Sequence, residues 1–402
     1  MLPTPTSNLL GNIEQIVAAK AQEAGFTKAG IAPVPPPGDD SYRELEYVGG
    51  WVERGHAGEM EYLKRRDQEN RLLRSSLRVP FPWVRSVIVC AANYHADAVR
   101  STDAAPEDKG WVARYAWTGF AKSAGPKPAG QAVAEQQGRG SEPLEASDYH
   151  DVLLRRLKKL DQELQNKLGR FESRCFVDTG PLVERVYAKY AGIGWIGKNT
   201  CMINQELGSW FFLGVILTAL ELPQVTGRSG LTVAADRCGS CTRCIDACPT
   251  DALIAPHQMD ASRCIAYLTI EKRGAIPEEL RSRIGRQVFG CDICQDVCPW
   301  NRRAPISEDA ELALRPELVN PALDWMAELD TASFRRLFRH SPMSRAKLPG
   351  LLRNVAIAMG NSRLDRFIPK LHEWSTSEDP VLADAATWAI RQIKGAENSD
   401  RA

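Results

Sequence analysis

Eight of the eleven cysteines lie in the second half of the chain, most of them in two closely spaced groups. The first group has the spacing C-x2-C-x2-C-x3-C before a proline and comprises Cys238, Cys241, Cys244 and Cys248. The second has the spacing C-x2-C-x3-C, again before a proline, and comprises Cys291, Cys294 and Cys298. Thiolates at these spacings bind 4Fe–4S clusters, and the fourth cysteine of the first run ligates the neighbouring cluster. The two groups therefore predict a pair of adjacent clusters.

Two clusters need eight thiolates, and Cys264, supplied from a longer loop, is available as the eighth. We assign one cluster to Cys238, Cys241, Cys244 and Cys298, and the other to Cys248, Cys264, Cys291 and Cys294. Zinc sites are the alternative, but zinc-binding segments do not use this spacing twice. Such clusters carry single electrons, so the rest of the chain must explain their purpose.

Helix and strand patterns alternate over the first 230 residues. Apolar residues at helical spacing predict helices at 8–24 and 149–168, and a further helix is expected to open at Pro181. Apolar runs predict strands at 84–92, 174–177 and 210–217. This alternation predicts an α/β or α+β domain at 1–230.

The rest of the chain divides by composition. Residues 118–147 are rich in Gly, Ala, Gln and Pro and lack apolar periodicity, which predicts a mobile inserted loop. The cysteine-rich segment occupies a second domain at 231–305, and the pattern at 306–402 is helical. Helices at 346–374 and 379–395 are expected to stack in pairs. We therefore expect an α+β protein with three domains.

Composition and the N-terminus limit the cellular location. The chain is 44% hydrophobic with a net charge of +1, so total charge indicates no class of partner. The first residues lack the basic and apolar stretches of a signal peptide, and the longest apolar run, 210–220, is too short to span a bilayer. We expect a cytoplasmic protein without membrane contact. In that reducing compartment clustered cysteines bind metals more often than they form disulfides.

Positive charge is concentrated near the C-terminus. Between residues 333 and 372 nine Lys or Arg residues stand against one acid, Asp365. Arg281, Arg283 and Arg286 form a second basic group near the cysteines. Charge of one sign attracts an anionic partner such as a nucleic-acid backbone, and the alternative is a solvated helix face.

Four segments, at 178–204, 208–214, 263–271 and 291–301, resemble the epoxyqueuosine reductase family, the longest being DTGPLVERVYAKYAGIGWIGKNTCMIN. The resemblance implies an N-terminal nitroreductase-like domain that binds base-off cobalamin, a ferredoxin-like domain with two 4Fe–4S clusters, and C-terminal HEAT-like helices. It also implies the reaction, in which cob(I)alamin fed by the clusters reduces epoxyqueuosine to queuosine in tRNA.

The resemblance makes Asp178 the proton donor for the departing oxygen. Asp178 follows an apolar strand and precedes a turn, where partial burial favours the protonated form that an acid catalyst needs at neutral pH. The alternative role is the N-cap of the helix expected at Pro181.

The resemblance further implies cobalamin contacts from Arg71, His150, Asp178, Gly197, Lys198, Asn199 and Ser209. A surface charge, a helix end and tight turns are the alternatives for Arg71, His150 and Gly197. Two features depart from the family. The inserted stretch separates Arg114-Tyr115-Ala116 from Asp148-Tyr149-His150, and Ala266 replaces a serine.

The implied partner is the anticodon stem-loop of tRNA, with contacts expected from Arg281, Arg283, Arg335, Arg336, Arg339, Arg345, Lys347 and Arg353. An external low-potential electron donor such as a flavodoxin or ferredoxin is also implied, and we expect a monomer. Two alternatives remain open. A reductive dehalogenase shares cobalamin and two clusters but is typically exported, whereas a plain electron-transfer protein would bind no cobalamin.

Overall fold

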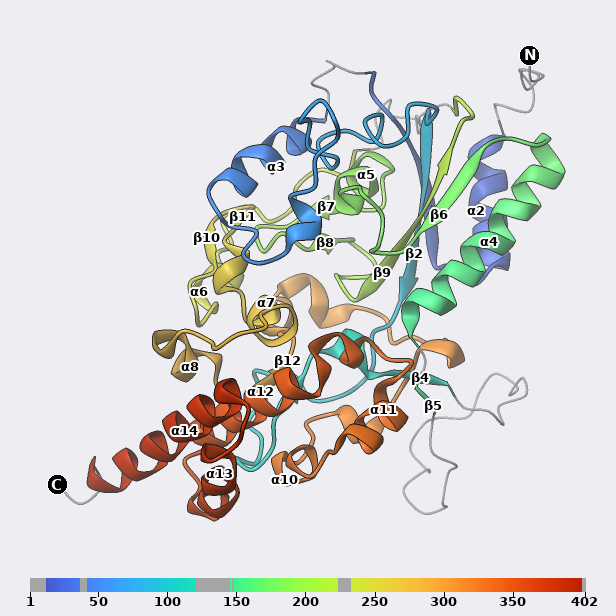
Figure 1. Ribbon diagram of the computed structural model, residues 1–402. Coiled ribbons are helices and arrows are strands. Elements are labelled where there is room, and N and C mark those ends of the chain that lie inside the picture. The colour runs from blue at the N-terminus through green and yellow to red at the C-terminus, as the bar shows by residue number, and fades with distance from the viewer. Residues whose placement is uncertain (1–11, 37–41, 121–144, 147, 223–232, 400–402) are drawn as a thin grey trace.

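The computed structural model describes residues 12–36, 42–120, 145–146, 148–222 and 233–399. Its N-terminal half is built on a four-stranded sheet in the order β1-β2-β9-β6, in which all neighbours are antiparallel (Figure 1). The strands are β1 (Lys28–Pro33), β2 (Ser86–Asn93), β9 (Phe211–Thr218) and β6 (Ser173–Phe176). The strands predicted at 84–92, 174–177 and 210–217 are confirmed to within two residues.

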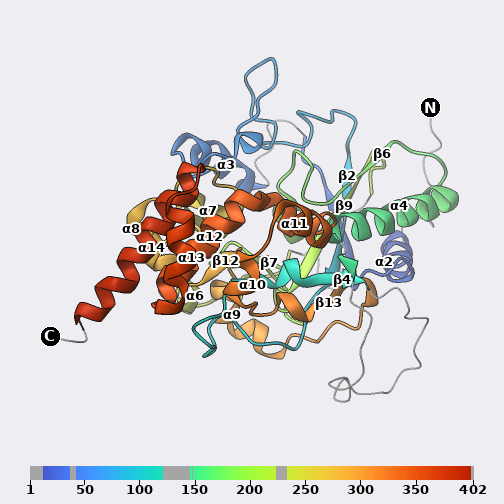
Figure 2. The same ribbon diagram turned by 60° about the horizontal axis from the view of Figure 1, so that its bottom comes forward.

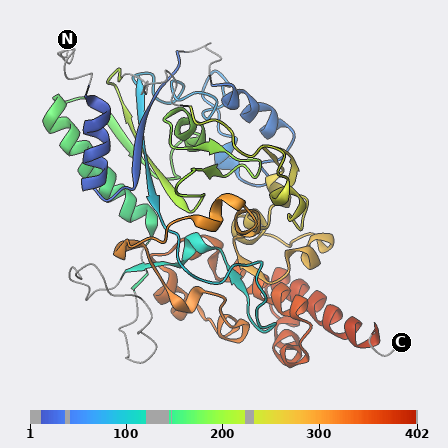
Figure 3. The ribbon, with the colours of Figure 1, turned by 180° about the vertical axis from the view of Figure 1, so that it is seen from behind.

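One face of the sheet is covered by α2 (Ile13–Glu23) and α4 (Tyr149–Leu168), which Figure 3 shows from behind. α4 forms because leucines recur at helical spacing, and Leu153, Leu157, Leu160 and Leu164 are fully buried. The helix ends before Gly169, whose φ of 87° suits glycine. The bounds predicted for this helix are confirmed.

The opposite face packs against α5 (Glu184–Tyr190) and residues of α3 (Arg43–Glu53). α5 begins three residues after Pro181, so the predicted start is wrong. The reason is local, because Asp178 has a left-handed φ of 55° and the turn that follows it occupies the intervening residues.

The cysteine-rich segment consists of short elements. They are α6 (Arg243–Asp246), β10 (Leu253–Ala255), β11 (Gln258–Met259), α7 (Ile265–Ile270), α8 (Glu278–Ile284), β12 (Gln287–Phe289) and α9 (Ile293–Asp296). α6 carries Cys244, α9 carries Cys294, and the two helices pack against each other. The hairpin of β7 (Trp195–Ile196) and β8 (Met202–Ile203) comes from the N-terminal half.

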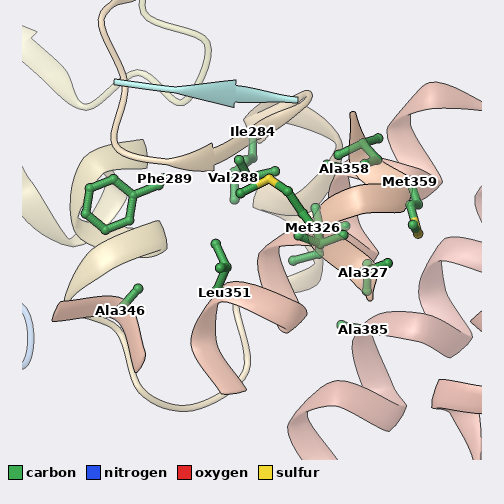
Figure 4. Close-up of a cluster of buried hydrophobic side chains, with 14 of the residues drawn as sticks. Ile284, Val288, Phe289, Met326, Ala327, Ala346, Leu351, Ala358, Met359 and Ala385 are labelled. Atoms are coloured by element: carbon green, nitrogen blue, oxygen red, sulfur yellow. The ribbon is translucent and has the colours of Figure 1, made fainter. Parts of the chain in front are cut away.

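Part of the N-terminal half belongs to the core of the later segments. β3 (Trp111–Val112) pairs in parallel with β12, and β4 (Thr118–Phe120) pairs with β5 (Glu145–Ala146) and β13 (Ala313–Leu314). One hydrophobic core therefore joins Trp117 to Phe289 and Leu351, the last two of which Figure 4 shows. The domain boundaries predicted at residues 230 and 305 remain a prediction. Most of the predicted inserted loop, 118–147, lies outside the described residues.

The C-terminal segment is helical (Figure 2). Its α-helices are α10 (Leu323–Ala327), α11 (Thr331–Phe338), α12 (Lys347–Ser362), α13 (Ile368–Ser375) and α14 (Pro380–Ser399). The single helix predicted at 346–374 is divided, because Arg363 after α12 adopts a left-handed φ of 58°. A HEAT-like repeat remains a prediction. Within the described ranges, no helix is long and apolar enough to cross a bilayer.

Candidate cluster sites and active site

The first predicted set of cluster ligands lies towards the surface. Cys238, Cys241 and Cys244 are partly exposed around α6, and Cys298 is buried. Burial raises the pKa of Cys298 to about 11, and the nearby thiols of Cys238 and Cys244 also raise it. The fold therefore brings Cys298 to the other three thiols despite its distance in the sequence.

An indole N–H faces this set. Trp195 of β7 meets Trp300 edge to face, with 5.0 Å between ring centroids. Its Nε1 is buried and has no hydrogen-bond partner among the described residues. Burial raises the pKa of Cys238, and the neighbouring Trp195 indole acts against that rise. A buried N–H group beside a cysteine sulfur is consistent with a cluster site, because hydrogen bonds to the sulfurs help to set the reduction potential of such clusters.

The second set comprises Cys248, Cys264, Cys291 and Cys294, all of which are partly exposed. Burial raises the pKa of both Cys264 and Cys291, with Cys248 adding to both shifts. Among the residues that the structure describes, no three His, Cys, Asp or Glu side chains converge on a site for a single ion. The support for 4Fe–4S clusters therefore comes from the spacing of the cysteines in the sequence and from the proximity of their thiols in the fold.

A ninth cysteine touches the second set. The Cys201 thiol interacts with that of Cys294, and this interaction lowers the pKa of Cys201 to about 7. The amide of Asn199 donates to the Cys294 carbonyl over 3.2 Å. Sequence reasoning left Cys201 without a role, although its place directly after the GKNT turn was the available signal.

Two further residues predicted to contact cobalamin hold the cluster segment in place. The Lys198 ammonium donates to the carbonyls of Gly239 and Cys241 over 2.6 and 3.0 Å. The Ser209 hydroxyl is buried and donates to Gln295 over 2.9 Å. These contacts fix the N-terminal half against both groups of cysteines.

Gly197 and Arg71 have simple structural contacts. A Cβ on Gly197 would lie 2.4 Å from the Cδ1 of Ile203, so packing against that side chain favours glycine. Arg71 is exposed and its Nε donates to Asp67 over 2.7 Å. The alternatives of a turn and a surface ion pair account for both residues, and their contact with cobalamin stays a prediction.

The start of α4 and the end of β6 form a polar site around Asp178. The hydroxyl of Tyr149 donates to the Asp178 carboxylate, and the ring of Tyr149 stacks on Phe212 with 3.9 Å between centroids. His150 Nε2 lies 3.8 Å from the same carboxylate, whose side chain remains 47% exposed. The carboxylate is thus bound by Tyr149 on one side and faces solvent on another.

Asp178 does not cap the helix that follows it. The N-cap of α5 is Val183, and no side chain caps it. The Asp178 backbone N–H instead donates to the Glu184 side chain over 2.9 Å. The alternative of a helix cap is therefore wrong, and the left-handed turn presents the carboxylate to Tyr149.

The surroundings of Asp178 favour the protonated forms of two neighbours. Burial acts to lower the pKa of His150, but its 2.6 Å hydrogen bond to Asp148 and the charges of Asp148 and Asp178 outweigh burial and raise that pKa. Burial, together with the Asp178 charge, raises the pKa of Tyr149 well above its usual range. Two groups that can carry a proton therefore lie next to Asp178.

The inserted stretch does not separate the motifs on either side of it in space. Tyr115 meets Tyr149 edge to face, with 6.2 Å between ring centroids. Arg114 is buried, and its guanidinium lies 5.0 Å from the centre of the Trp210 ring. Arg345, from the C-terminal segment, reaches the same region, because its charge acts on both Tyr115 and His150.

Comparison with known proteins identifies the family. The family model described as "Epoxyqueuosine reductase QueG, DUF1730" matches residues 74–119 and 123–179, and a 4Fe-4S double cluster binding domain matches 237–301. The epoxyqueuosine reductase of Xanthomonas campestris is 36% identical over 375 residues, which cover 92% of this chain and 94% of the relative. This chain belongs to the epoxyqueuosine reductase family. It is therefore an oxidoreductase.

Solved epoxyqueuosine reductases share its fold. One, crystallised with an epoxyqueuosine-modified tRNA-Tyr stem loop, gives a TM-score of 0.77 at 26% identity and covers 96% of this chain and 91% of that one. Another, from Bacillus subtilis, has its aspartate-bearing catalytic loop swung out of the active site and gives a TM-score of 0.76 at 27% identity over 96% and 91% of the chains.

The basic residues predicted to contact RNA fall into two classes. Arg335, Arg336, Arg339, Arg345 and Lys347 are exposed around α11 and η8 (Pro342–Ala346). Arg353 is 1% exposed and donates to the carbonyls of Lys272, Gly274 and Leu268.

Arg281 is also buried, and it pairs with Asp384. The structure therefore does not support an RNA contact from Arg281 or Arg353. Arg283 is exposed and pairs with Asp251 over 2.5 Å.

Proposed function

We propose that this chain reduces epoxyqueuosine to queuosine in tRNA with cobalamin and two 4Fe–4S clusters, and that Asp178 donates a proton to the departing oxygen. The observation that carries the proposal is the half-exposed Asp178 carboxylate, held by Tyr149 beside His150. The catalytic loop named for the Bacillus subtilis relative also bears an aspartate.

The cysteines would hold the clusters as assigned from the sequence. When bound, the clusters would supply single electrons, and reduced cobalamin would supply the strong nucleophile that opening of an epoxide needs. An external low-potential electron donor such as a flavodoxin or ferredoxin would dock beside the first set, where residues 239–240 and 242–243 between its cysteines are exposed. The second set lies beside Cys201 and the GKNT turn.

The histidine at the site suits a cobalamin that takes no imidazole from the protein. His150 Nδ1 is bound to Asp148 at 2.6 Å, and Nε2 faces Asp178 at 3.8 Å. Both ring nitrogens are thus directed at carboxylates. This arrangement fits the base-off cofactor that the sequence implies, with His150 serving the carboxylate rather than a metal.

The exposed basic residues would receive the tRNA. Arg335, Arg336 and Arg339 have no acidic partner within 4 Å among the described residues. His340, next to them, acts electrostatically on Asp148, so this surface borders the Asp178 site. A phosphate backbone bound there would place an unpaired anticodon base near Asp178.

The test is nucleoside analysis of tRNA from a deletion strain complemented with variants. We expect epoxyqueuosine to accumulate in the deletion strain, and Asp178→Asn to leave at least about 99% of the modified base as epoxide, because an amide cannot donate the carboxyl proton. Asp97→Asn is the control for loss of a carboxyl group, since Asp97 is exposed and lies outside the site. Restored queuosine with Asp178→Asn would contradict the proposed proton donor.

A further inference from the structure

Glu184, the first residue of α5, contacts Asp178. Its Oε1 accepts the Asp178 backbone N–H over 2.9 Å, and the two carboxyl groups interact electrostatically. The pair joins the end of β6 to the start of α5.

The surroundings of Glu184 favour its neutral form. Burial raises the pKa of Glu184 well above its usual range, and the charge of Asp178 raises it further. Arg185 opposes the shift, and Arg74 also faces this carboxyl. On the other side, Asp178 faces Tyr149, His150 and Tyr115.

The proposed reaction needs more than one proton. Converting an epoxide to an alkene breaks both C–O bonds, forms one C=C bond and releases the oxygen as water, which consumes two electrons and two protons. The clusters account for the electrons, and a single carboxyl group holds one proton. A second proton must therefore reach the reacting oxygen during each turnover, either from solvent at the exposed side of Asp178 or from a neighbouring side chain.

We propose that Glu184 is a positioning residue that holds the second proton and passes it to Asp178. This inference rests on the proposed role of Asp178. Tyr149 is a poorer source, because losing its proton would leave a buried phenolate. His150 lies 3.8 Å away without a hydrogen bond to Asp178, and its Nδ1 is bound to Asp148.

The test is single-turnover reduction of an epoxyqueuosine stem-loop by the holoenzyme between about pH 6 and 9. Glu184→Gln keeps an oxygen for the Asp178 amide but carries no transferable proton. A coupled pair retains one proton to higher pH than a single carboxyl group does. We therefore expect the rate to fall at least about tenfold at the alkaline end, with the alkaline limb of the profile shifted to lower pH.

The controls separate this role from a structural one. Glu44→Gln is the matched variant, because Glu44 also contacts α5, through Lys189 and Tyr190, but lies away from Asp178. It should keep the wild-type rate and profile. Glu184→Ala also removes the amide acceptor, so a purely structural role predicts loss of rate in Glu184→Ala with wild-type behaviour in Glu184→Gln.

That structural pattern would overturn the inference while leaving the proposed function intact. Failure of the proposed function looks different, because Asp178→Asn would then reduce the stem-loop at the wild-type rate. Iron and cobalt content measured on each variant would show that the same holoenzyme is compared.

Discussion

Three side chains around Asp178 are each shifted towards their protonated form. The pKa values of Tyr149, His150 and Glu184 are all raised, the first and last by burial and the second by its carboxylate neighbours. These side chains come from two helices on opposite faces of the sheet. The sheet edge is therefore the structural means by which the protein gathers several protons at one carboxylate.

The Tyr149 hydroxyl should contribute to the rate without contributing to the fold. We expect Tyr149→Phe to lower the single-turnover rate roughly tenfold, because a hydrogen bond to a charged group contributes about 1.5–3 kcal/mol. The ring would still stack on Phe212. Tyr267→Phe removes a hydroxyl bound to the Glu59 amide and is the control. A wild-type rate for Tyr149→Phe would show that the hydroxyl does not support catalysis.

The sequence predicted residues of this site only where a motif marked them. Asp178 and His150 belong to recognisable motifs. Glu184 lies in the same 178–204 segment as Asp178, but nothing in the local sequence indicates that its side chain contacts the Asp178 backbone. Arg281 and Arg353 were misjudged because a run of basic residues does not reveal which of them point inwards. Arg353 is buried because three backbone carbonyls replace water around its charge.

At the scale of elements, the close approach of α12 and α14 depends on a glycine. A Cβ on Gly360 would lie 2.7 Å from the Cα of Ala389, a backbone atom that cannot move aside. Gly350 lies on the same helix, and a Cβ added there would have no contact within 4 Å among the described residues. Substitution of Gly360 therefore tests helix packing, whereas substitution of Gly350 tests helix propensity alone.

Alanine at these glycines should have opposite effects. We expect Gly360→Ala to lower the free energy of unfolding by about 1–3 kcal/mol, because the helices must separate. Gly350→Ala should raise it by up to about 1 kcal/mol, because alanine favours a helix more than glycine does. Anaerobic urea unfolding followed by circular dichroism measures both. Equal effects of the two substitutions would mean that the contact with α14 does not limit packing.

Elements with their own periodicity were predictable, and elements defined by distant partners were not. α4 was predicted at its observed bounds because its leucines form one continuous stripe. β3 has two residues and exists only because β12 pairs with it. The start of α5 was misplaced because the left-handed Asp178 lengthens the preceding turn, and backbone conformation at an aspartate is not visible in its sequence.

At the scale of the whole molecule, the C-terminal helices are joined to the active site rather than appended to it. The shared core runs from Trp117 to the C-terminal helices. Arg345 acts on Tyr115, and His340 acts on Asp148. The exposed arginines of α11 are therefore fixed relative to Asp178, which is the geometry needed to position one base of a long anionic substrate.

This surface should set the salt dependence of tRNA binding. We expect the triple variant Arg335→Ala, Arg336→Ala and Arg339→Ala to weaken binding of the stem-loop roughly tenfold or more and to reduce the slope of log Kd against log salt by about two, since each lost phosphate contact removes about 0.7–0.9. The matched triple variant Arg366→Ala, Lys370→Ala and Arg391→Ala removes cations that already pair with acids. It should leave the slope unchanged, because those charges release few counterions from RNA. Equal slopes for the two triple variants would place the tRNA on another face of the protein.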